Sequence, residues 1–532
     1  MHFFAPDDRI APMDNCTCRA CGGADLIAHV KASSQGLTAI TEECEYIYYL
    51  CNECRSLNEF SEEGTFYKEA QEIDFANYYV DIIAGLEEMI APIGSYIKAN
   101  GSKDGQSFLE LGCGFGFVVD YVGKCCGLQS EGIEPSGYGR LGQQLLEVAI
   151  SDTLLGEGSP HDHKRFDIIY SAEVIEHIAT PEIFAATISR HIKPEGIAIF
   201  TTPNAEFIIP ESPAAETYSA LFPGEHKILF SAQGLRILLK RVGLSHLTVK
   251  KRRDSNLIAY AASCSGPITV AEAAQSDNAT ILTREYLSTY RNSSKHKKEK
   301  ISRLGLAMHY RLFKDFVNNG WADQAIFLLA EMRPSFRCEV DPSMDYSVSS
   351  ETDDISELLH EMLSLCSICL QKESILSQDH HLHYPRGGIA FGKNMGYYIT
   401  TVIHQIFKPE PAPILNSSIN YLNIFIDHCM WLRRGSHPYY HLEAISLIGP
   451  AVASLFLFLL KASSPIDEKK FTFIEEPWFK EEQPVSYSEI QMHLKIYRER
   501  HDALLVKNFS KDIREQTINP IQRVLKQLQR RA

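Results

Sequence analysis

The stretch Phe108-Leu109-Glu110-Leu111-Gly112-Cys113-Gly114-Phe115-Gly116-Phe117 decides the fold of this chain. Its apolar first residues predict a short buried strand, and the apolar run that begins at Phe117 predicts a helix. Three glycines between them allow positive φ angles and let a ligand approach the main chain closely. The helix N-terminus then directs free N–H groups at whatever lies over the turn. The stretch therefore predicts a strand–turn–helix unit of the nucleotide-binding kind.

A second acidic residue identifies the kind of ligand. Glu134 ends the next apolar strand, roughly 20 residues further on, where a doubly wound fold places the residue that binds a ribose. The turn lacks the Lys-Ser/Thr pair of a phosphate-binding loop. The pattern Glu-x-Gly-x-Gly-x-Gly followed by Glu134 resembles the class I S-adenosylmethionine-dependent methyltransferases.

The periodicity of residues 105–265 predicts an α/β unit. The last two predicted strands are joined only by Asp254-Ser255, which predicts an antiparallel hairpin. The resemblance implies a seven-stranded, doubly wound Rossmann-like sheet. We expect strands at 107–111, 129–134, 147–150, 166–171, 196–202, 246–253 and 256–263, with helices at 115–126, 137–146, 181–192 and 231–242.

The resemblance also assigns cofactor-binding residues. Glu110 would accept from the amino group of S-adenosylmethionine, and Glu134 has two oxygens for the two ribose hydroxyls. Asp152, after the third strand, is a candidate for the adenine amine or a plain turn residue. The glycines of the turn would make room for the tail and ribose, and Ser171 ends the fourth strand. The cofactor-binding set is thus Glu110, Gly112, Gly114, Gly116, Glu134, Asp152 and Ser171.

The segment that follows the fourth strand carries the candidate catalytic residues. Glu173, Glu176 and His177 are spaced i, i+3 and i+4, which predicts that they share one face of a helical turn. They could bind a divalent cation, magnesium among the candidates, or supply a base. His177 could instead have only a structural role.

Two families share parts of this segment. Glu-x-x-Glu-His resembles the magnesium-assisted ubiquinone-biosynthesis O-methyltransferases and the small-RNA 2′-O-methyltransferases. The latter also have a Thr-Pro-Asn-x-Glu stretch and a further histidine, which map here onto 202–206 and His226. Similar residues occur in metal-free methyltransferases, so His226 joins the catalytic candidates with or without a metal.

The N-terminal region contains two Cys-x-x-Cys pairs, Cys18/Cys21 and Cys51/Cys54, which predict a four-cysteine zinc ribbon over residues 1–62. A four-sulfur site leaves no open position, so its zinc would be structural. Cys16 could replace Cys18 in this set. A ribbon directly before a class I domain resembles bacterial methyltransferases of saccharide and secondary-metabolite clusters.

Length and composition limit the remaining possibilities. A chain of 532 residues is expected to form several domains. Its net charge of −15 argues against nucleic acid as a partner. The start of the chain has no secretory signal, which predicts a cytoplasmic protein. The run 444–460 is shorter than the roughly 20 residues that span a membrane.

The other regions carry weaker patterns. Residues 63–104 predict a helical connector, broken near Pro92, with Tyr78 and Tyr79 as lid candidates. Residues 266–300 read as a polar linker. Residues 301–532 predict a mainly helical domain of unknown role that could dock a protein partner. Its expected helices are 304–316, 321–332, 355–370, 414–431, 442–460, 488–506 and 517–529.

Three functional hypotheses follow. The first is O-methylation of a saccharide or another polar small molecule, with His177 as base or orienting residue. The second is RNA 2′-O-methylation with a metal held by Glu173, Glu176, His177 and His226. The third is a scaffold protein with a degenerate methyltransferase domain.

Overall fold

The computed structural model describes residues 1–5, 16–34, 44–61, 86–101, 105–156, 161–253, 255–263, 277–295, 301–341, 343, 354–376, 390–407, 412–434, 448–455, 457–459, 473 and 476. The chain divides into two compact units. One consists of Met1–Gln35 with Ile40–Ser293, and the other of Gly36–Ala39 with Ser294–Ala532. All the candidate site residues belong to the first unit.

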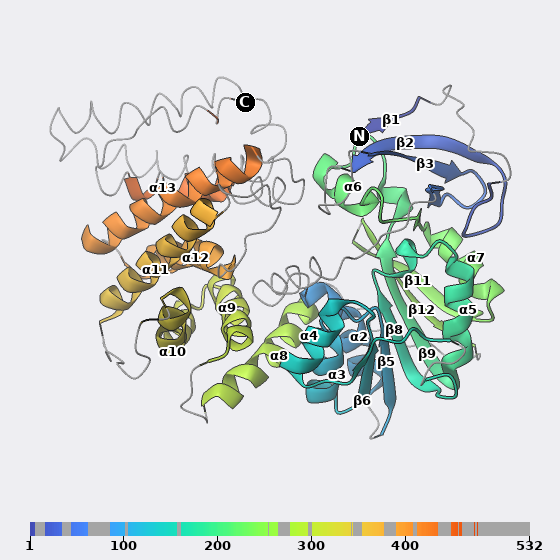
Figure 1. The fold of residues 1–532 in the computed structure, drawn as a ribbon, viewed down its shortest axis with the longest axis horizontal. Helices are drawn as coiled ribbons and strands as arrows, with labels where there is room; N and C mark the ends of the chain where they lie inside the picture. Colours follow the sequence, from blue (N-terminus) through green and yellow to red (C-terminus); the bar gives the residue numbers. More distant parts are fainter. Residues whose placement is uncertain are drawn as a thin grey trace. The chain divides into compact units, whose positions relative to one another are not determined.

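The first unit is built on a mixed seven-stranded sheet, drawn in Figure 1. Its order is β11-β12-β9-β8-β5-β6-β7, and only the two pairings of β12, with β11 and with β9, are antiparallel. The seven-stranded Rossmann-like sheet and its terminal hairpin are thereby confirmed. The strands are β5 (Ser107–Leu111), β6 (Gln129–Ile133), β7 (Ile150–Ser151), β8 (Phe166–Ala172), β9 (Ile192–Pro203), β11 (His246–Arg253) and β12 (Asn256–Ala262).

Helices cover both faces of this sheet. On one side α3 (Phe117–Cys126) packs on β5 and β6, together with α2 (Leu86–Asn100) and α4 (Gly137–Leu146). On the other side α5 (Pro181–His191) packs on β9 and α7 (Ala232–Arg241) on β11 and β12. The break expected near Pro92 is wrong, because α2 continues through this proline. The third strand begins at Ile150 and not at the expected residue 147, because Glu147 caps the C-terminus of α4 in a left-handed conformation.

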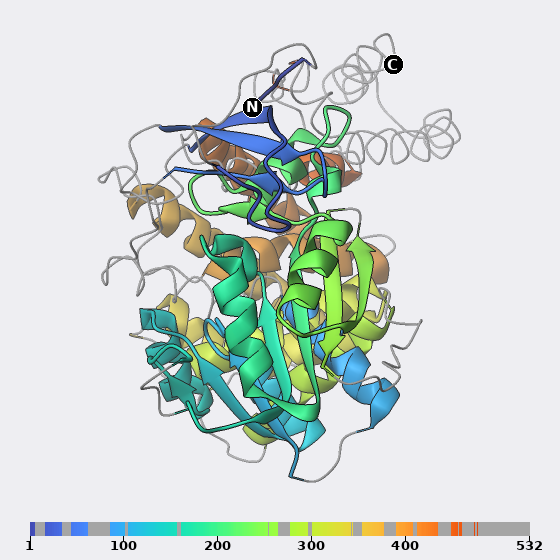
Figure 2. The same ribbon diagram turned by 90° about the vertical axis from the view of Figure 1, so that its right-hand side faces the viewer.

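A second sheet joins the N-terminal region to the α/β unit. It has the order β1-β2-β3-β4-β10, and its blue strands lie at the top of Figure 2. The first four strands are β1 (His2–Phe3), β2 (Leu26–Ser34), β3 (Cys44–Cys51) and β4 (Leu57–Asn58). The fifth, β10 (Ile228–Leu229), comes from the α/β unit, after the short helix α6 (Ala214–Leu221). Strands β2 and β3 connect the two cysteine pairs, whereas β10 and α6 were not predicted.

One apolar core connects the two sheets. Cys18, Cys51 and Cys54 are buried in the same cluster as Phe230, on the segment before α7, and Leu235 of α7. Beyond the hairpin, residues 277–295 of the predicted linker form α8 (Asp277–Lys295). Its Tyr286 donates a 2.6 Å hydrogen bond to Asp120 of α3.

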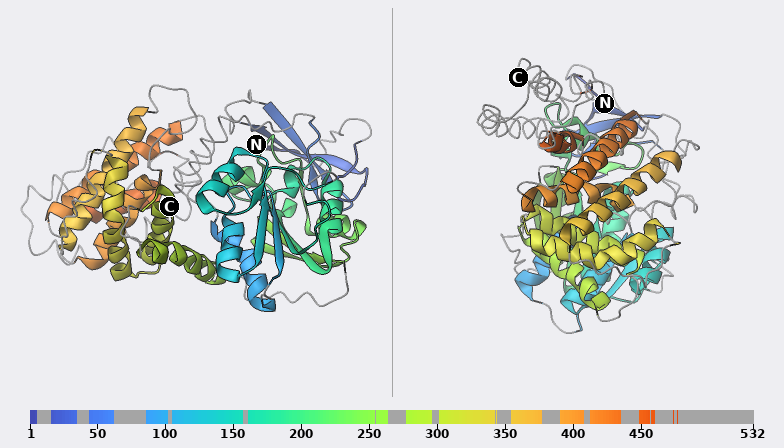
Figure 3. Two further views of the ribbon diagram at one scale, coloured as in Figure 1. Left: turned by 60° about the horizontal axis from the view of Figure 1, so that its bottom comes forward. Right: turned by 90° about the vertical axis from the view of Figure 1, so that its left-hand side faces the viewer.

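The second unit is helical wherever it is described over any length, as Figure 3 shows. α9 (Arg303–Asn318) packs on α10 (Ala322–Val340), and α11 (Ile355–Leu376) packs on α10, α12 (Ala390–Ile406) and α13 (Ala412–Arg434). Helix α12 was not predicted, and the expected helices 488–506 and 517–529 lie outside the described residues. Within the described part of the chain, no helix is long and apolar enough to cross a membrane. Tyr78 and Tyr79 also lie outside that part.

Candidate functional site

The glycine-rich turn connects β5 to α3 in the predicted way. Gly112, Gly114 and Gly116 have φ angles of 68°, 50° and 86°, which L side chains rarely adopt. A Cβ at Gly112 would lie 2.5 Å from Val174 Cγ2, and one at Gly116 would lie 2.7 Å from Ile150 Cδ1. A Cβ at Gly114 would meet no heavy atom within 4 Å. The open space over the turn is therefore at Gly114.

Two carboxylates lie beside this space. Glu110 is only 3% exposed, and its Oε2 has no hydrogen-bond partner among the described residues. Burial, and next the charge of Glu134, raise the pKa of Glu110 well above its ordinary value. Glu134 accepts 3.0 Å hydrogen bonds from the N–H groups of Gly114 and Ser136, one on each oxygen. Its remaining lone pairs can still accept from a ligand.

These residues fit S-adenosylmethionine. The unsatisfied oxygen of Glu110 could accept from an ammonium group, and the two oxygens of Glu134 could accept from a ribose diol. The Oγ of Ser171, which is buried at the end of β8, also lacks a partner among the residues that the structure describes. Asp152 directly follows β7 and is exposed, so its role in binding adenine stays a prediction.

A buried cluster of one carboxylate and two imidazoles lies close to the turn. Glu176, His177 and His226 each offer one ligand atom, and these atoms all lie within 4.8 Å of one another. His226 Nε2 is 4.0 Å from Glu176 Oε1, and the two imidazole rings are nearly perpendicular with centroids 4.5 Å apart. Glu176 is fully buried. Because Val174 packs at Gly112, the cluster adjoins the glycine-rich turn.

A hydrogen bond to the main chain orients the imidazole of His226 in the cluster. His226 Nδ1 lies 2.7 Å from the carbonyl of Ala220, and since a carbonyl only accepts, Nδ1 must carry the proton. The backbone of Glu225 favours the protonated ring of His177, but burial outweighs this effect on its pKa. Burial lowers the pKa of His177 to about 4 and that of His226 well below its ordinary value. Both rings are therefore neutral and keep one nitrogen lone pair each.

Glu176 completes the cluster with one oxygen that has no hydrogen-bond partner in the described part of the chain, Oε1. Its other oxygen accepts a 3.0 Å hydrogen bond from Thr202 Oγ1. Burial, and next the charge of Glu173, raise the pKa of Glu176 well above its ordinary value. A cation at the centre would favour the ionised carboxylate, and the donated ring N–H groups are typical of metal-binding histidines.

Glu173 lies outside this group of three. The helical turn expected over Glu173–His177 is wrong, because Glu173 has a left-handed φ of 54° and only Ile175–His177 form a short 3-10 helix. The exposed side chain of Glu173 accepts instead from Asn256 Nδ2 of β12, at 3.4 Å. Neither Thr202 as a partner of Glu176 nor Asn256 as a partner of Glu173 was predicted, because each contact joins the segment after β8 to a different strand, β9 or β12.

The four cysteines of the N-terminal region meet as their spacing predicts. The sulfurs of Cys18, Cys21, Cys51 and Cys54 lie within 4.8 Å of one another. Two pairs, Cys18–Cys54 and Cys21–Cys51, are 3.5 and 3.6 Å apart. A tetrahedral zinc with bonds of about 2.3 Å would place its sulfurs about 3.8 Å apart. A hydrogen bond from Cys54, outweighing the effect of burial, lowers the pKa of Cys18 to about 5.

Comparison with known proteins shows which kind of domain the sequence around this site resembles. Residues 85–249 match the family model described as a methyltransferase domain. (S)-coclaurine N-methyltransferase of Papaver somniferum is 32% identical over 130 residues, which are 23% of this chain and 37% of that protein. The ubiquinone biosynthesis O-methyltransferase of Alkalilimnicola ehrlichii is 29% identical over 110 residues, 20% of this chain and 44% of that protein. The chain thus spans less than half the length of either curated relative.

A solved structure, the TehB-like SAM-dependent methyltransferase from Corynebacterium glutamicum, is 18% identical with a TM-score of 0.28. The match covers 37% of this chain and 99% of that one. The curated relatives include both N- and O-methyltransferases, so their names leave the acceptor atom open. The matched range contains the glycine-rich turn, Glu134 and the Glu176/His177/His226 cluster. Residues 85–249 of this chain therefore match a methyltransferase domain.

Proposed function

We propose that the protein is an S-adenosylmethionine-dependent O-methyltransferase whose acceptor is a hydroxyl of a saccharide or another polar small molecule. The observation that carries this proposal is the convergence of a Glu176 oxygen with one ring nitrogen each of His177 and His226 beside the glycine-rich turn. An activated sulfonium needs little help as a methyl donor, whereas a hydroxyl must be oriented and deprotonated. A neutral imidazole held by a carbonyl on its other nitrogen is suited to accept that proton.

The proposed roles follow from where each residue lies. Glu110, Gly114 and Glu134 would hold the cofactor, with Gly112 and Gly116 shaping the turn and Ser171 and Asp152 at neighbouring strand ends. Held at the turn, the cofactor would present its methyl group toward the carboxyl end of β8. His177 or His226 would take the hydroxyl proton, and the buried Glu176, in its ionised form, would stabilise the imidazolium formed.

The same three side chains also fit a divalent cation. When bound, such a cation would lower the pKa of an acceptor hydroxyl. Two imidazoles and one carboxylate suit Mn²⁺, Fe²⁺ or Zn²⁺ better than Mg²⁺, which prefers oxygen ligands. The expected role of Glu173 as a fourth ligand has no support from the cluster, and magnesium is not favoured by its donors.

Zinc at the four-cysteine cluster is a further part of the proposal. The sulfur–sulfur distances of 3.5 and 3.6 Å support it. Four thiolates would saturate the metal, so the role would be structural. For the helical unit, docking of a protein partner stays a prediction, and so does the cytoplasmic location.

Labelled methyl transfer tests the proposed function. The purified full chain is incubated with methyl-labelled S-adenosylmethionine and, separately, with nucleotide-sugar and glycan pools or total RNA. Label in the saccharide fraction that disappears in His226→Ala and Glu176→Gln supports the proposal. Glu182→Gln is the matched control, since Glu182 is exposed and pairs with Arg241.

Other outcomes choose between the alternatives. Label in RNA alone would favour 2′-O-methylation. The structural support for that alternative is the hydrogen bond to Glu176 from Thr202, the first residue of the shared Thr-Pro-Asn-x-Glu stretch. If calorimetry detects no binding of S-adenosylmethionine, the scaffold role is the hypothesis that remains. Loss of activity in EDTA with the cysteine-bound metal retained, and its recovery with Mn²⁺, would assign a cation to Glu176, His177 and His226.

A further inference from the structure

Strand β10 connects the four-cysteine cluster to the Glu176/His177/His226 cluster within a few residues. It begins directly after His226 and Lys227, and it pairs with β4, which begins three residues after Cys54. In the register of this pair Ile228 is opposite Asn58. The N–H of Glu59 donates to the carbonyl of Lys227 at 3.0 Å and extends the pairing toward the histidine.

On one side, this pairing is tied to the cysteines. Asn58 Nδ2 lies 3.5 Å from the sulfur of Cys18, and the carbonyl oxygen of its side chain accepts from the N–H of Arg19 at 2.9 Å. Ser231, which begins α7, donates its hydroxyl to the carbonyl of Cys54. A Cβ on Gly234 in the first turn of α7 would lie 3.3 Å from the sulfur of Cys54. Strand β10 is therefore anchored at residues that contact the sulfurs.

On the other side, the pairing reaches the candidate catalytic cluster through Lys227. The main-chain N–H of Lys227 donates to the carbonyl of Glu176 at 2.8 Å. Since His226 precedes Lys227, this bond holds the segments of Glu176 and His226 side by side. The position of β10 thus affects the distance between the carboxylate and the imidazole.

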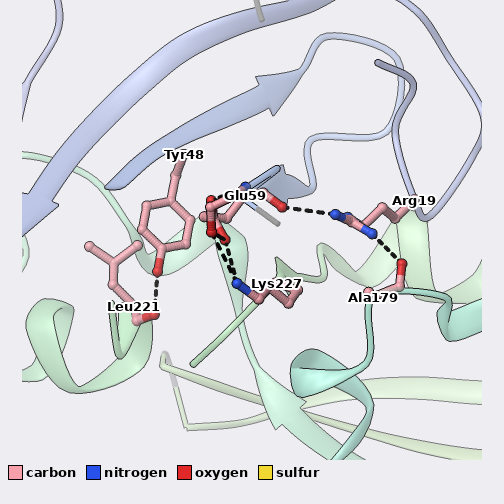
Figure 4. A network of polar contacts seen from close by, with 7 residues as sticks. Arg19, Tyr48, Glu59, Ala179, Leu221 and Lys227 are labelled. Atoms are coloured by element: carbon pink, nitrogen blue, oxygen red, sulfur yellow. Dashed lines mark hydrogen bonds and ion pairs between the residues drawn. The ribbon is translucent and has the colours of Figure 1, made fainter. Parts of the chain in front are cut away.

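The side chain of Lys227 turns back toward the cysteine region and forms a buried ion pair. Its Nζ lies 2.9 Å from Glu59 Oε2 and 3.1 Å from Ser61 Oγ, and both charged side chains are more than nine-tenths buried. Figure 4 shows this pair between Tyr48 and Arg19, with Tyr48 donating to the carbonyl of Leu221. Arg19 reaches from the carbonyl of Glu59 to that of Ala179, just beyond His177. A buried ion pair of this kind fixes register and relative position more than it adds stability.

We propose that Glu59 and Lys227 are positioning residues. Through them the folded, metal-loaded cysteine region holds Glu176, His177 and His226 in their relative positions. The cysteine region then acts as a support of the active site, not as a separate module for acceptor binding. The effect of this inference on kcat rests on the proposed function. Its effect on hydrogen exchange can be measured without an acceptor.

The test compares four versions of the full chain. Glu59→Gln combined with Lys227→Met removes both charges, so that no unpaired charge is left buried. Lys227→Arg keeps a cation that can pair with Glu59. Glu45→Gln is the matched control, because Glu45 forms an ion pair with Lys31 on the exposed side of the same region.

Hydrogen exchange read by mass spectrometry gives the readout that needs no acceptor. In the double variant we expect exchange over residues 222–230 and 173–178 to become at least about tenfold faster. Exchange over residues 108–118, zinc content and affinity for S-adenosylmethionine should stay as in the unsubstituted chain. Lys227→Arg should keep the protection of the unsubstituted chain, and removal of zinc from the unsubstituted chain should reproduce the faster exchange.

With an acceptor in hand, the double variant should lower kcat at least about tenfold with the KM for S-adenosylmethionine unchanged. Equal exchange in the double variant and Glu45→Gln, or acceleration that includes residues 108–118 to the same extent, would overturn the proposal. If the unsubstituted chain fails to bind S-adenosylmethionine, the proposed function fails, while the exchange experiment still decides the coupling.

Discussion

The N–H of Lys227 donates a 2.8 Å hydrogen bond to the carbonyl of Glu176. Through this bond, segments that are 51 residues apart in sequence hold the carboxylate of Glu176 near the imidazole of His226. The cluster is thus held by main-chain contacts between loops at the carboxyl edge of the sheet. Predictions about the site can therefore separate residues that touch ligands from residues that hold the loops.

Glu110 should lose a proton when S-adenosylmethionine binds. Its pKa in the free protein is raised by burial and by Glu134, whereas an ammonium group beside it would favour the ionised form. Affinity should therefore rise with pH until the raised pKa is passed. Calorimetry in buffers of different ionisation enthalpy measures the released proton. Glu110→Gln should bind about 10- to 100-fold more weakly without that release, and an unchanged release in this variant would contradict the assignment.

The same residue should influence the stability of the free protein. A carboxyl whose pKa is higher in the folded state contributes stability below its unfolded pKa and loses that contribution as pH rises. The free protein should therefore lose stability with rising pH above about 4.5 on account of Glu110. Thermal unfolding near pH 8 should show Glu110→Gln to be more stable than the unsubstituted chain, and a lower melting temperature would contradict this.

Gly114→Ala should separate a binding defect from backbone strain. Its φ of 50° makes a side chain unfavourable by about 1–2 kcal/mol, and the added methyl group would occupy the open space over the turn. Gly127 has a φ of 71° with nothing near its Cβ position, but it lies at the far end of α3. Gly127→Ala should therefore show a similar loss of thermal stability and bind S-adenosylmethionine normally. Equal affinities for the two variants would place the cofactor elsewhere.

Gly142→Ala should destabilise the protein more than Gly114→Ala or Gly127→Ala. A Cβ there would lie 1.9 Å from the carbonyl oxygen of Phe115, so α4 could not keep its place against the turn. Both the melting temperature and the affinity for S-adenosylmethionine should fall. A melting temperature equal to that of Gly127→Ala would show that the helix can shift freely.

Cys51→Ser should remove the zinc. The purified chain should contain one zinc per molecule, and the variant less than a tenth of that, because three thiolates lose the fourth bond that closes the site. Thermal unfolding should shift to lower temperature. Cys125 is exposed and outside the cluster, so Cys125→Ser is the control. Zinc retained at full occupancy in Cys51→Ser would disprove a four-sulfur site.

Tyr286→Phe should loosen α8 from the methyltransferase domain. The buried Asp120 accepts hydrogen bonds from Tyr286 and Tyr290 and pairs with Lys124 at 2.8 Å. Removing one hydroxyl should cost about 1–3 kcal/mol, because the bond is made to a charged group. Ser288→Ala, which loses only a contact within α8, should cost far less. Equal stabilities would mean that α8 contributes little to the domain.

Local patterns in the sequence predicted much of this protein. Three glycines after an apolar strand predicted the turn, and the Asp254-Ser255 junction predicted the antiparallel hairpin of the sheet. The Cys-x-x-Cys pairs predicted the four-sulfur cluster. These features depend on φ angles, strand periodicity and the short loop between two ligands, which neighbouring residues determine. Helix α12 and the continuation of α2 through Pro92 were missed, because packing against other elements decides them.

The amino-acid sequence by itself indicated which residues are candidates to bind a methyl donor and which thiolates are candidates to close a metal site. Only the tertiary structure decided that Glu176, His177 and His226 meet without Glu173, and that β10 joins the cysteine region to this cluster. The physical reason is distance along the chain. A turn is specified by the conformational preferences of adjacent residues, whereas the ion pair of Glu59 with Lys227, 168 residues apart, requires β10 to pair with β4.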